Sequence, residues 1–540
     1  MINNVKQNNV VEWTFQSEKS YSEPFHEIRF EAVVTGPDGK ERRLPGFWAG
    51  KGQWKLRYSS SQIGEHQFRT VCSDENDLGL HGQSGRVQIE PYNGDNPLYK
   101  HGAVRASDCR SYLKHEDGTP FFWLADTWWM SLTKRLQWPE DFKWLTQDRV
   151  EKGFTAIQLV AGLYPDMAPF DERGAAEGGQ AWETDFQRIN PAFFDTADAK
   201  IEWLVESGLM PCMVACWGYY LDFAGKENIK KHWEYLVARY GAYPVVWCIA
   251  GEATMPYYQW DSFSDSDLKK PYVERLRKEW TEIANFIGSI DPFQRALTIH
   301  PTEYGHDMVE DASVLDLDML QTGHSGILTV GNTVRKVRDS VAREPKTPVI
   351  NSEVCYEGIG GTSFQEVQRM LFWNCMLNGA CGHTYGANGI WQVNDEKQPY
   401  GASPTGIAWG HTFWKEAAQL PGSRQVGIGK KLLENYRWWE FQPHPEWVNP
   451  VLEETDVYSR VYAAGITGEV RVIYAPMHLA FSGVTVRELE DVIPYRAYAF
   501  DPATADVYDM GRIQVNKDGT WSSGRLKIFQ DWVLVIERIQ

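Results

Sequence analysis

Between about residue 121 and residue 385, short apolar runs alternate with amphipathic stretches, and this rhythm constrains the fold more than any other feature. The runs have the length and composition of buried parallel strands. There are eight of them: 121–126, 156–161, 210–216, 245–250, 295–300, 319–322, 348–353 and 380–385. One stretch between them, 194–208, has apolar residues at helical spacing and ends in Gly208, which suits a C′ cap. Eight strands alternating with helices predict a closed (β/α)8 barrel.

The segments on either side of this region have a different pattern. Residues 28–34, 52–58 and 66–71 alternate apolar and polar side chains, and so do 457–464, 469–474 and 532–536. Period-2 alternation broken by Gly, Pro, Asp and Ser predicts antiparallel β-sandwiches. We therefore predict three domains: a β-sandwich over 1–95, an α/β barrel over 96–425 and a second β-sandwich over 426–540.

Composition excludes several classes of partner. The formal net charge is -18, from 54 basic and 72 acidic side chains, which argues against nucleic acid and anionic membranes. No run of eighteen apolar residues is present, and residues 1–10 lack the pattern of a signal peptide, so we expect a cytoplasmic protein. No GxGxxG or GxxxxGK[ST] loop follows a strand, so no nucleotide cofactor is expected. The sequence leaves open whether the chain forms homo-oligomers.

The cysteines do not predict a metal site. Six of them fall in apolar segments without CxxC spacing, and we expect these to be reduced core residues: Cys212, Cys216, Cys248, Cys355, Cys375 and Cys381. His300, His324 and His383 follow or occupy predicted strands, but no HExxH motif accompanies them. We therefore expect these histidines to bind sugar hydroxyls or Glu353, and we expect no metal.

Two glutamates carry the functional prediction. Glu252 follows the fourth predicted strand and Glu353 ends the seventh, about a hundred residues later. Hydrolysis of a glycosidic bond requires one carboxylic acid to protonate the leaving oxygen and one carboxylate to attack or to activate water. In a barrel, the carboxyl ends of all strands meet at one rim, where active sites lie. The two glutamates therefore predict a glycosidase.

Other polar and aromatic residues fall at the same predicted rim. The 24 tryptophans of the chain are compatible with sugar stacking, although core packing accounts for many of them. The Gly-rich segment 162–182 suits a loop folded over a pocket, or equally a surface insertion. We expect the following side chains to bind substrate: Asp126, Trp128, Trp129, Gln158, Trp217, Tyr219, His300, His324, Tyr356, His383, Tyr385 and Trp391.

With these residues in place, the chain resembles the apiosidase-like glycoside hydrolases over nearly all of its length. The motifs that carry the resemblance are Asn96-Pro-Leu-Tyr-Lys-His-Gly, Asp117-Gly-Thr-Pro-Phe-Phe-Trp-Leu-Ala-Asp-Thr-Trp-Trp, Ile189-Asn-Pro-Ala-Phe-Phe-Asp, Val246-Trp-Cys-Ile-Ala-Gly-Glu and Asn351-Ser-Glu. The resemblance implies a fibronectin-like first domain and a clan A barrel. It implies Glu252 as acid/base, Glu353 as nucleophile, and Asp126 with Trp128 at the sugar subsite.

Two departures from this pattern bear on the substrate. Apiosidases carry aspartate where this chain has Glu252, which argues against apiose itself. Clan A enzymes carry an asparagine before the acid, where it contacts the sugar 2-hydroxyl, and this chain has Gly251. Contact with that hydroxyl must then come from elsewhere, with His300 and His324 as candidates. An unusual or furanose sugar would fit such a departure.

The expected activity is exo-acting, retaining hydrolysis of an oligosaccharide or glycoside by double displacement. Glu353 attacks, and Glu252, with its pKa raised by the charge of Glu353 and by aromatic surroundings, donates the proton. The alternatives are an inverting hydrolase, a transglycosidase, or a non-catalytic carbohydrate-binding protein on a barrel scaffold.

Overall fold

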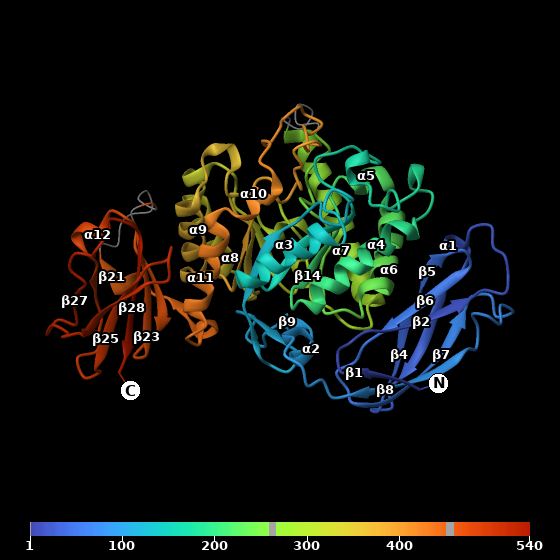
Figure 1. Cartoon of the computed structure of the whole chain (residues 1–540), viewed down its shortest axis with the longest axis horizontal. Helices are drawn as coiled ribbons and strands as arrows, with labels where there is room; N and C mark the ends of the chain where they lie inside the picture. The colour runs from blue at the N-terminus through green and yellow to red at the C-terminus, as the bar shows by residue number, and fades with distance from the viewer. Residues whose placement is uncertain (1, 259–265, 450–457, 459, 540) are drawn as a thin grey trace.

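The computed structural model describes residues 2–258, 266–449, 458 and 460–539. It contains a central α/β domain with an antiparallel sheet domain on either side, the first in blue and the last in red in Figure 1. The predicted fold class is confirmed. The domain boundaries at 95/96 and 425/426 stay predictions, and helix α11 (Pro421–Leu433) runs through the second of them.

The central domain is built on eight parallel strands in the order β16-β15-β14-β13-β12-β19-β18-β17. Each overlaps one predicted strand: β12 Trp123–Thr127, β13 Ala156–Leu163, β14 Met210–Cys216, β15 Val246–Cys248, β16 Leu297–Thr298, β17 Asp318–Gln321, β18 Val349–Glu353 and β19 Gly382–Tyr385. Between β16 and β17, the Asp316 N–H donates to the Leu297 carbonyl at 2.8 Å and the Thr298 hydroxyl donates to the Leu317 carbonyl at 2.9 Å. These bonds close the barrel.

Helices surround the strands and cover the outer face of the barrel, and the strands' own side chains fill the inner face. The principal ones are α3 Glu140–Glu151, α4 Pro191–Glu206, α6 Lys226–Tyr240, α7 Ser266–Ile290, α8 Thr329–Val341, α9 Gln365–Leu377 and α11. Helix α4 shows why the sequence folds this way. Asn190 caps its first turn by accepting from the Ala192 N–H, Pro191 occupies the first position, and Gly208 follows its end at φ 79°. The predicted helix over 194–208 and its glycine cap are confirmed.

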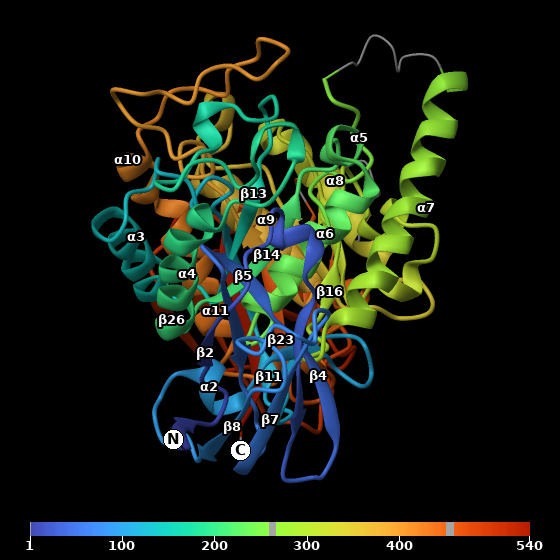
Figure 2. The same cartoon turned by 90° about the vertical axis from the view of Figure 1, so that its right-hand side faces the viewer.

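The strands are apolar along their whole length because neither face meets water. All seven residues of β14 are buried, and so are all eight of β13. The six cysteines predicted to lie in the core are buried and free, as expected. Figure 2 shows the long segment between β19 and α10 (Trp414–Ala418), in orange, at the end of the barrel opposite the two chain termini.

The first domain contains a five-stranded sheet in the order β1-β8-β7-β3-β4 and a three-stranded sheet in the order β2-β6-β5. Their strands are β1 Ile2–Lys6, β2 Val11–Gln16, β3 Phe30–Thr35, β4 Glu41–Pro45, β5 Phe47–Gly50, β6 Gln53–Tyr58, β7 Gly64–Cys72 and β8 Ser84–Glu90. The two sheets share one apolar core, which includes Ala32 and Val87 from one sheet and Leu56 from the other. One pairing differs from the expected antiparallel pattern, because β1 runs parallel to β8.

The last domain contains a six-stranded sheet in the order β20-β22-β23-β28-β25-β26 and a three-stranded sheet in the order β21-β24-β27. Its longest strands are β22 Tyr462–Ile466, β23 Val470–Ala475, β25 Tyr495–Phe500, β26 Val507–Arg512 and β28 Trp532–Arg538. Residues 457 and 459 of the predicted strand 457–464 lie outside the described residues. One face of the larger sheet packs on α9, where Trp373 stacks on Tyr474 and Arg369 pairs with Asp531 at 2.7 Å.

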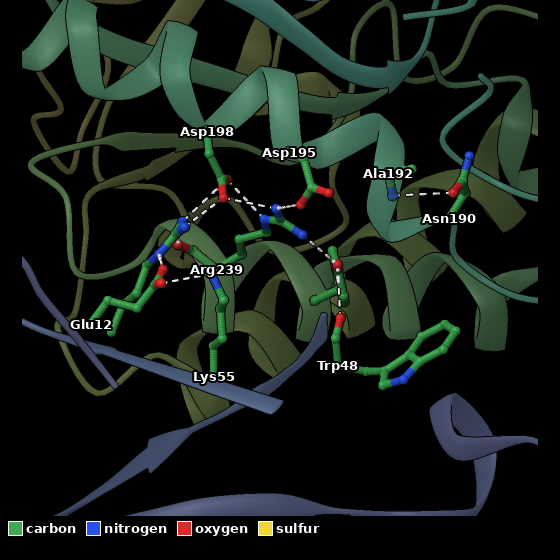
Figure 3. Close-up of polar contacts among 10 residues, drawn as sticks. Glu12, Trp48, Lys55, Asn190, Ala192, Asp195, Asp198 and Arg239 are labelled. Carbon is green, nitrogen blue, oxygen red and sulfur yellow. Dashed lines mark hydrogen bonds and ion pairs between the residues drawn. The ribbon is translucent and has the colours of Figure 1, made fainter. Parts of the chain in front are cut away.

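A buried ion cluster joins the first domain to the barrel. Asp198 on α4 accepts from Arg239 of α6 at 2.8 Å and from Arg57 of β6 at 3.2 Å. Figure 3 shows Asp198 and Asp195 on either side of the Arg239 guanidinium, above the strands of the first domain. Burial opposes ionisation of Asp198, but the charges of Arg239 and Arg57 prevail and lower its pKa to about 2. The interface therefore depends on this carboxylate.

We expect Asp198→Ala to lower the free energy of unfolding by about 3–5 kcal/mol, because it leaves two buried guanidinium groups without their counter-charge. Asp195→Ala is the matched control: Asp195 contacts the same Arg239 but is 67% exposed, so its loss should cost less than about 1 kcal/mol. Because the folded pKa of Asp198 lies below the ordinary 3.8, its stabilisation is complete above about pH 4 and is lost as the pH falls toward 2. Thermal unfolding between pH 3 and 7 measures both effects; equal losses in the two variants would contradict this assignment.

Candidate active site

The carboxyl ends of the barrel strands open into a cavity of about 570 Å³ that contains both predicted glutamates. Glu353 is the last residue of β18, and Glu252 follows β15. A cavity of about 660 Å³ lies between the first domain and the barrel, and neither glutamate lines it. The residues that line the cavity around the glutamates include Trp129, Asp166, Trp217, Tyr258, Glu303, Gln321, His324, Asn332, Lys336, Tyr356, Trp391 and Trp409.

Glu353 is buried between two imidazoles. His324 Nε2 lies 2.8 Å from one carboxylate oxygen, and His300 Nε2 lies 2.9 Å from the other in a bent electrostatic contact. His300 Nδ1 is held by Ser352 Oγ at 3.1 Å. Burial alone would raise the pKa of Glu353, but the two imidazoles hold it well below the usual carboxyl range. In return, hydrogen bonds with Cys355 and Glu353 overcome burial and raise the pKa of His324 to about 10.

Glu252 has the opposite electrostatic environment. Its pKa is raised, first by burial and then by the charge of Glu353, as expected from the sequence. The Trp217 indole N–H donates to one of its oxygens at 3.0 Å. The backbone of Glu252 has φ 43°, in the left-handed region that non-glycine residues seldom adopt. The cavity therefore holds two carboxyl groups whose pKa values are shifted in opposite directions, that of Glu353 downward and that of Glu252 upward.

Gln321, the last residue of β17, connects the two carboxyl groups. Its side-chain N–H₂ donates to Glu252 Oε1 and to Glu353 Oε1, each at 3.1 Å. The two bridged oxygens are therefore no farther apart than twice that distance. The Gln321 backbone carbonyl in turn accepts from Lys336 Nζ at 3.1 Å. The amide is a positioning group that fixes the spacing of the pair.

The position of the Trp217 ring explains why the residue before Glu252 is a glycine. A Cβ placed on Gly251 would lie 2.3 Å from the Trp217 ring, which packs flat against this backbone. Residues 217 and 251 also form a parallel bridge that extends the pairing of β14 and β15. The tryptophan therefore fills the space in which a side chain at 251 would lie, and it supplies the N–H that holds Glu252.

Six of the expected substrate-binding residues reach this site. Trp129, Trp217, His324, Tyr356 and Trp391 line the cavity, and His300 touches Glu353 from beneath it. The Trp129 indole N–H donates to the Tyr356 hydroxyl at 3.2 Å. The His324 and Tyr356 rings lie 4.7 Å apart. The aromatic side chains thus form walls on which a sugar ring could stack.

Asp126 and Trp128 do not line the cavity, contrary to the expectation. Both are fully buried behind it. Asp126 accepts from Arg149 at 2.6 Å and from the Trp128 indole at 2.7 Å, so its charge is balanced inside the protein. Asp126 and Trp128 therefore have a structural role at the end of β12 and do not bind a sugar in the cavity.

The other four expected residues also face the protein interior. Gln158 donates to the Ser352 carbonyl at 2.9 Å, and the Tyr219 hydroxyl donates to the Tyr164 carbonyl at 2.8 Å. The Tyr385 hydroxyl donates to Glu357 at 2.5 Å. His383 is packed against Phe372, and burial lowers its pKa to about 3. Strand residues alternate between the barrel lumen and the helices, so being on a strand end did not decide which side chains reach the cavity.

Among the cavity residues that were not expected from the sequence are Asp166, Tyr258, Gln321 and Trp409. Asp166 lies within the Gly-rich segment 162–182 that was expected to cover a pocket, so the loop was indicated but not the residue. Gln321 lies within a predicted strand, where an amide at the carboxyl end was the available signal. Tyr258 and Trp409 lie in connecting segments whose course the sequence does not specify.

Within the described part of the chain, no group of three or more His, Cys, Asp or Glu side chains has the arrangement of a metal site. His300 and His324 both contact Glu353, whereas His383 lies elsewhere in the core. No helix among the described residues is both long and apolar enough to cross a bilayer.

Comparison with known proteins places this geometry in a family. Residues 107–440 match the family model described as the apiosidase-like catalytic domain, and residues 4–73 match a domain of unknown function, DUF5060. No curated protein matches the sequence.

Solved structures share the fold. One described as a glycoside hydrolase has a TM-score of 0.66 at 22% identity, covering 82% of this chain and 98% of its own. A glycoside hydrolase family 5 protein from Bacteroides vulgatus ATCC 8482 gives 0.64 at 22%, covering 82% and 95%. A second protein from that organism, provisionally described as a glycoside hydrolase, gives 0.71 at 17%, covering 99% and 100%. At such identities the likeness shows the architecture.

We expect Gly251→Ala to destabilise the protein by about 1–3 kcal/mol and to change its near-UV circular dichroism, because the new methyl group must displace the Trp217 ring. Gly288→Ala is the control, since a Cβ there meets nothing within 4 Å and the residue lies inside helix α7. That change should be neutral or stabilising by about 0.5–1 kcal/mol. An unchanged tryptophan signal in Gly251→Ala would show that the ring is not held as described.

Proposed function

Since the chain belongs to the apiosidase-like glycoside hydrolases, whose catalytic-domain model matches more than half of it, we propose that it cleaves glycosides with retention of anomeric configuration. The observation that carries this proposal is the pair of carboxyl groups with opposite pKa shifts, bridged by one amide. In the proposed reaction Glu353 is the nucleophile and Glu252 the acid/base.

The spacing of the pair supports retention over inversion. Retaining enzymes hold their carboxyl groups about 5–5.5 Å apart, and inverting enzymes about 6.5–9.5 Å apart to admit a water. Gln321 donates to one oxygen of each glutamate at 3.1 Å, so the two carboxyl groups approach each other across a single amide, and this closeness favours the retaining arrangement.

The chemistry then follows from the protonation states. Glu353, kept ionised by His300 and His324, attacks the anomeric carbon while protonated Glu252 donates to the departing oxygen. This forms a glycosyl ester on Glu353 and leaves Glu252 ionised. Loss of the nucleophile's charge lets the pKa of Glu252 fall, so it changes from acid to base and deprotonates the water that releases the sugar. No cofactor takes part in these steps.

Exo action and an unusual sugar are further parts of the proposal. Segments that follow several barrel strands, including the one between β19 and α10, line the cavity of about 570 Å³. Such a cavity suits the end of a sugar chain better than the middle of a continuous polysaccharide. Gly251, with Trp217 against it, leaves no side chain there to contact a 2-hydroxyl. Gln321 stands beside the nucleophile and, like His300 and His324, can supply that contact.

The first test is a screen of nitrophenyl furanosides and pyranosides in both anomeric forms. We expect the wild type to release nitrophenol from a subset and Glu353→Ala to lose at least about 10³-fold in kcat, since no ester can form. Azide added to Glu353→Ala should restore turnover and give a glycosyl azide of inverted configuration. Full activity in Glu353→Ala would refute the nucleophile assignment. Products formed on added acceptor sugars would identify a transglycosidase.

The pH profile tests the two imidazoles. In the wild type, kcat/KM should fall on the acid side only well below pH 4.5, where Glu353 becomes protonated, and on the alkaline side as Glu252 loses its proton above that value. His324→Ala removes a hydrogen bond and a positive charge, so the pKa of buried Glu353 rises and the acid limb moves to higher pH. His324→Gln, which keeps a donor without the charge, should give a smaller shift. A loss of activity with an unmoved acid limb would mean that His324 acts on structure alone.

A further inference from the structure

The cavity contains a third carboxylate that the proposed reaction does not use. Asp166 lies in the segment between β13 and α4 and lines the same cavity as the two glutamates. Its backbone has φ 56°, a conformation that costs a non-glycine residue about 1 kcal/mol or more. Such strain persists only where surrounding contacts impose it, so the side chain is held here by its environment.

Two other segments each donate one hydrogen bond to the Asp166 carboxylate, one to each of its oxygens. The Tyr258 hydroxyl, from the segment after β15, donates to Oδ1. The Trp409 indole N–H, from the segment after β19, donates to Oδ2 at 3.1 Å. A carboxylate offers about four acceptor sites. Each oxygen of Asp166 can therefore accept at least one further hydrogen bond. The two oxygens are adjacent, and Asp166 lines the cavity.

The remaining charges of the cavity suit an uncharged ligand. Among the described residues that line it, the acidic ones are Asp166, Glu252, Glu303 and Glu353, and the one lysine is Lys336. Lys336 is already used, since it donates to the Gln321 carbonyl and lies 3.4 Å from Glu303. The His324 imidazole is likewise engaged by Glu353. A ligand carboxylate would meet like charges there, which costs several kcal/mol.

We propose that Asp166 selects the sugar: its two oxygens accept hydrogen bonds from two adjacent hydroxyl groups, and its charge excludes uronic acids. The substrate class is thus a neutral glycoside with a free vicinal diol. The inference rests on the proposed glycosidase function and adds a specificity-determining residue to it. Burial raises the pKa of Asp166, whereas the hydrogen bonds from Tyr258 and Trp409 favour its ionised form. Tyr258 and Trp409 act through Asp166 and are positioning residues.

The experiment uses the aryl glycoside that the wild type hydrolyses fastest, together with its series of singly deoxygenated analogues, its uronic acid analogue and its amino-sugar analogue. For the wild type, two adjacent positions should stand out, each losing about 10- to 100-fold in kcat/KM on deoxygenation, because a hydrogen bond to a charged group is lost. The uronic acid should be the poorest substrate.

Asp166→Asn should lower kcat/KM on the parent glycoside by about 100-fold, and deoxygenation at the same two positions should then cost less than about 3-fold. The penalty at the other positions should not change, which a merely structural role would not produce. Glu172→Gln is the matched control, since it removes an exposed carboxylate from the same segment. It should leave every ratio as in the wild type.

The outcomes separate this inference from the proposed function. If the wild type hydrolyses a glycoside but Asp166→Asn matches it across the series, or if the uronic acid or amino sugar is preferred, the inference is overturned and the glycosidase stands. If the wild type hydrolyses no glycoside, the proposed function fails and the inference fails with it. Should Asp166→Asn not fold, the wild-type series decides: two adjacent sensitive positions support the inference, and no such pair refutes it.

Discussion

A negative charge buried at the floor of the cavity is the constraint on which the rest of the site depends. Glu353 is only 5% exposed, and an isolated carboxylate at such depth would take up a proton and cease to be a nucleophile. His300 and His324 prevent this from two sides, and Ser352 orients the first of them. The same charge that they stabilise raises the pKa of Glu252. One electrostatic arrangement therefore shifts the pKa values of the two carboxyl groups in opposite directions.

The contact between Trp217 and Gly251 shows how Glu252 is held in place. A side chain at 251 would collide with the indole ring, so the chain has glycine there and takes the hydrogen bond to Glu252 from the tryptophan instead. The amide beside Glu353 comes from a different strand and belongs to Gln321. Fixing a carboxyl group requires a donor at the right distance, and barrel strands can supply that donor from more than one position around the rim.

The sequence was sufficient for the features that rest on repeating patterns. Eight apolar runs located all eight barrel strands, and their order along the chain located Glu252 and Glu353 at one rim. It was also sufficient for the pKa direction of Glu252, since paired carboxyl groups in a buried site repel each other's charge. The parallel pairing of β1 with β8 was missed, because alternation shows that a segment is a strand but not which neighbour it pairs with.

The choice of cavity residues was harder to predict. Asp126, Trp128 and Tyr385 stand at strand ends like the glutamates, yet each has a buried partner that turns it away from the cavity: Arg149 for the aspartate, the aspartate for Trp128, and Glu357 for the tyrosine. Arg149 and Glu357 are distant in sequence from the residues that they hold, and no local pattern indicates these contacts. Asp166, Tyr258 and Trp409 were missed for the same reason, since they meet only when three segments fold over the rim.

This difference has a consequence for how such an enzyme acquires its substrate. Of the groups that would break the bond, Glu353 is paired to β17 by the strand ladder, and Glu252 directly follows the bridge between residues 217 and 251. The groups that would choose the sugar stand on connecting segments, held by contacts among side chains. Segments of this kind tolerate substitution and insertion far better than strands do. Changing the Asp166 contact would therefore alter which sugar enters without disturbing the charge balance around Glu353, and the barrel can keep one chemistry while its substrates diverge.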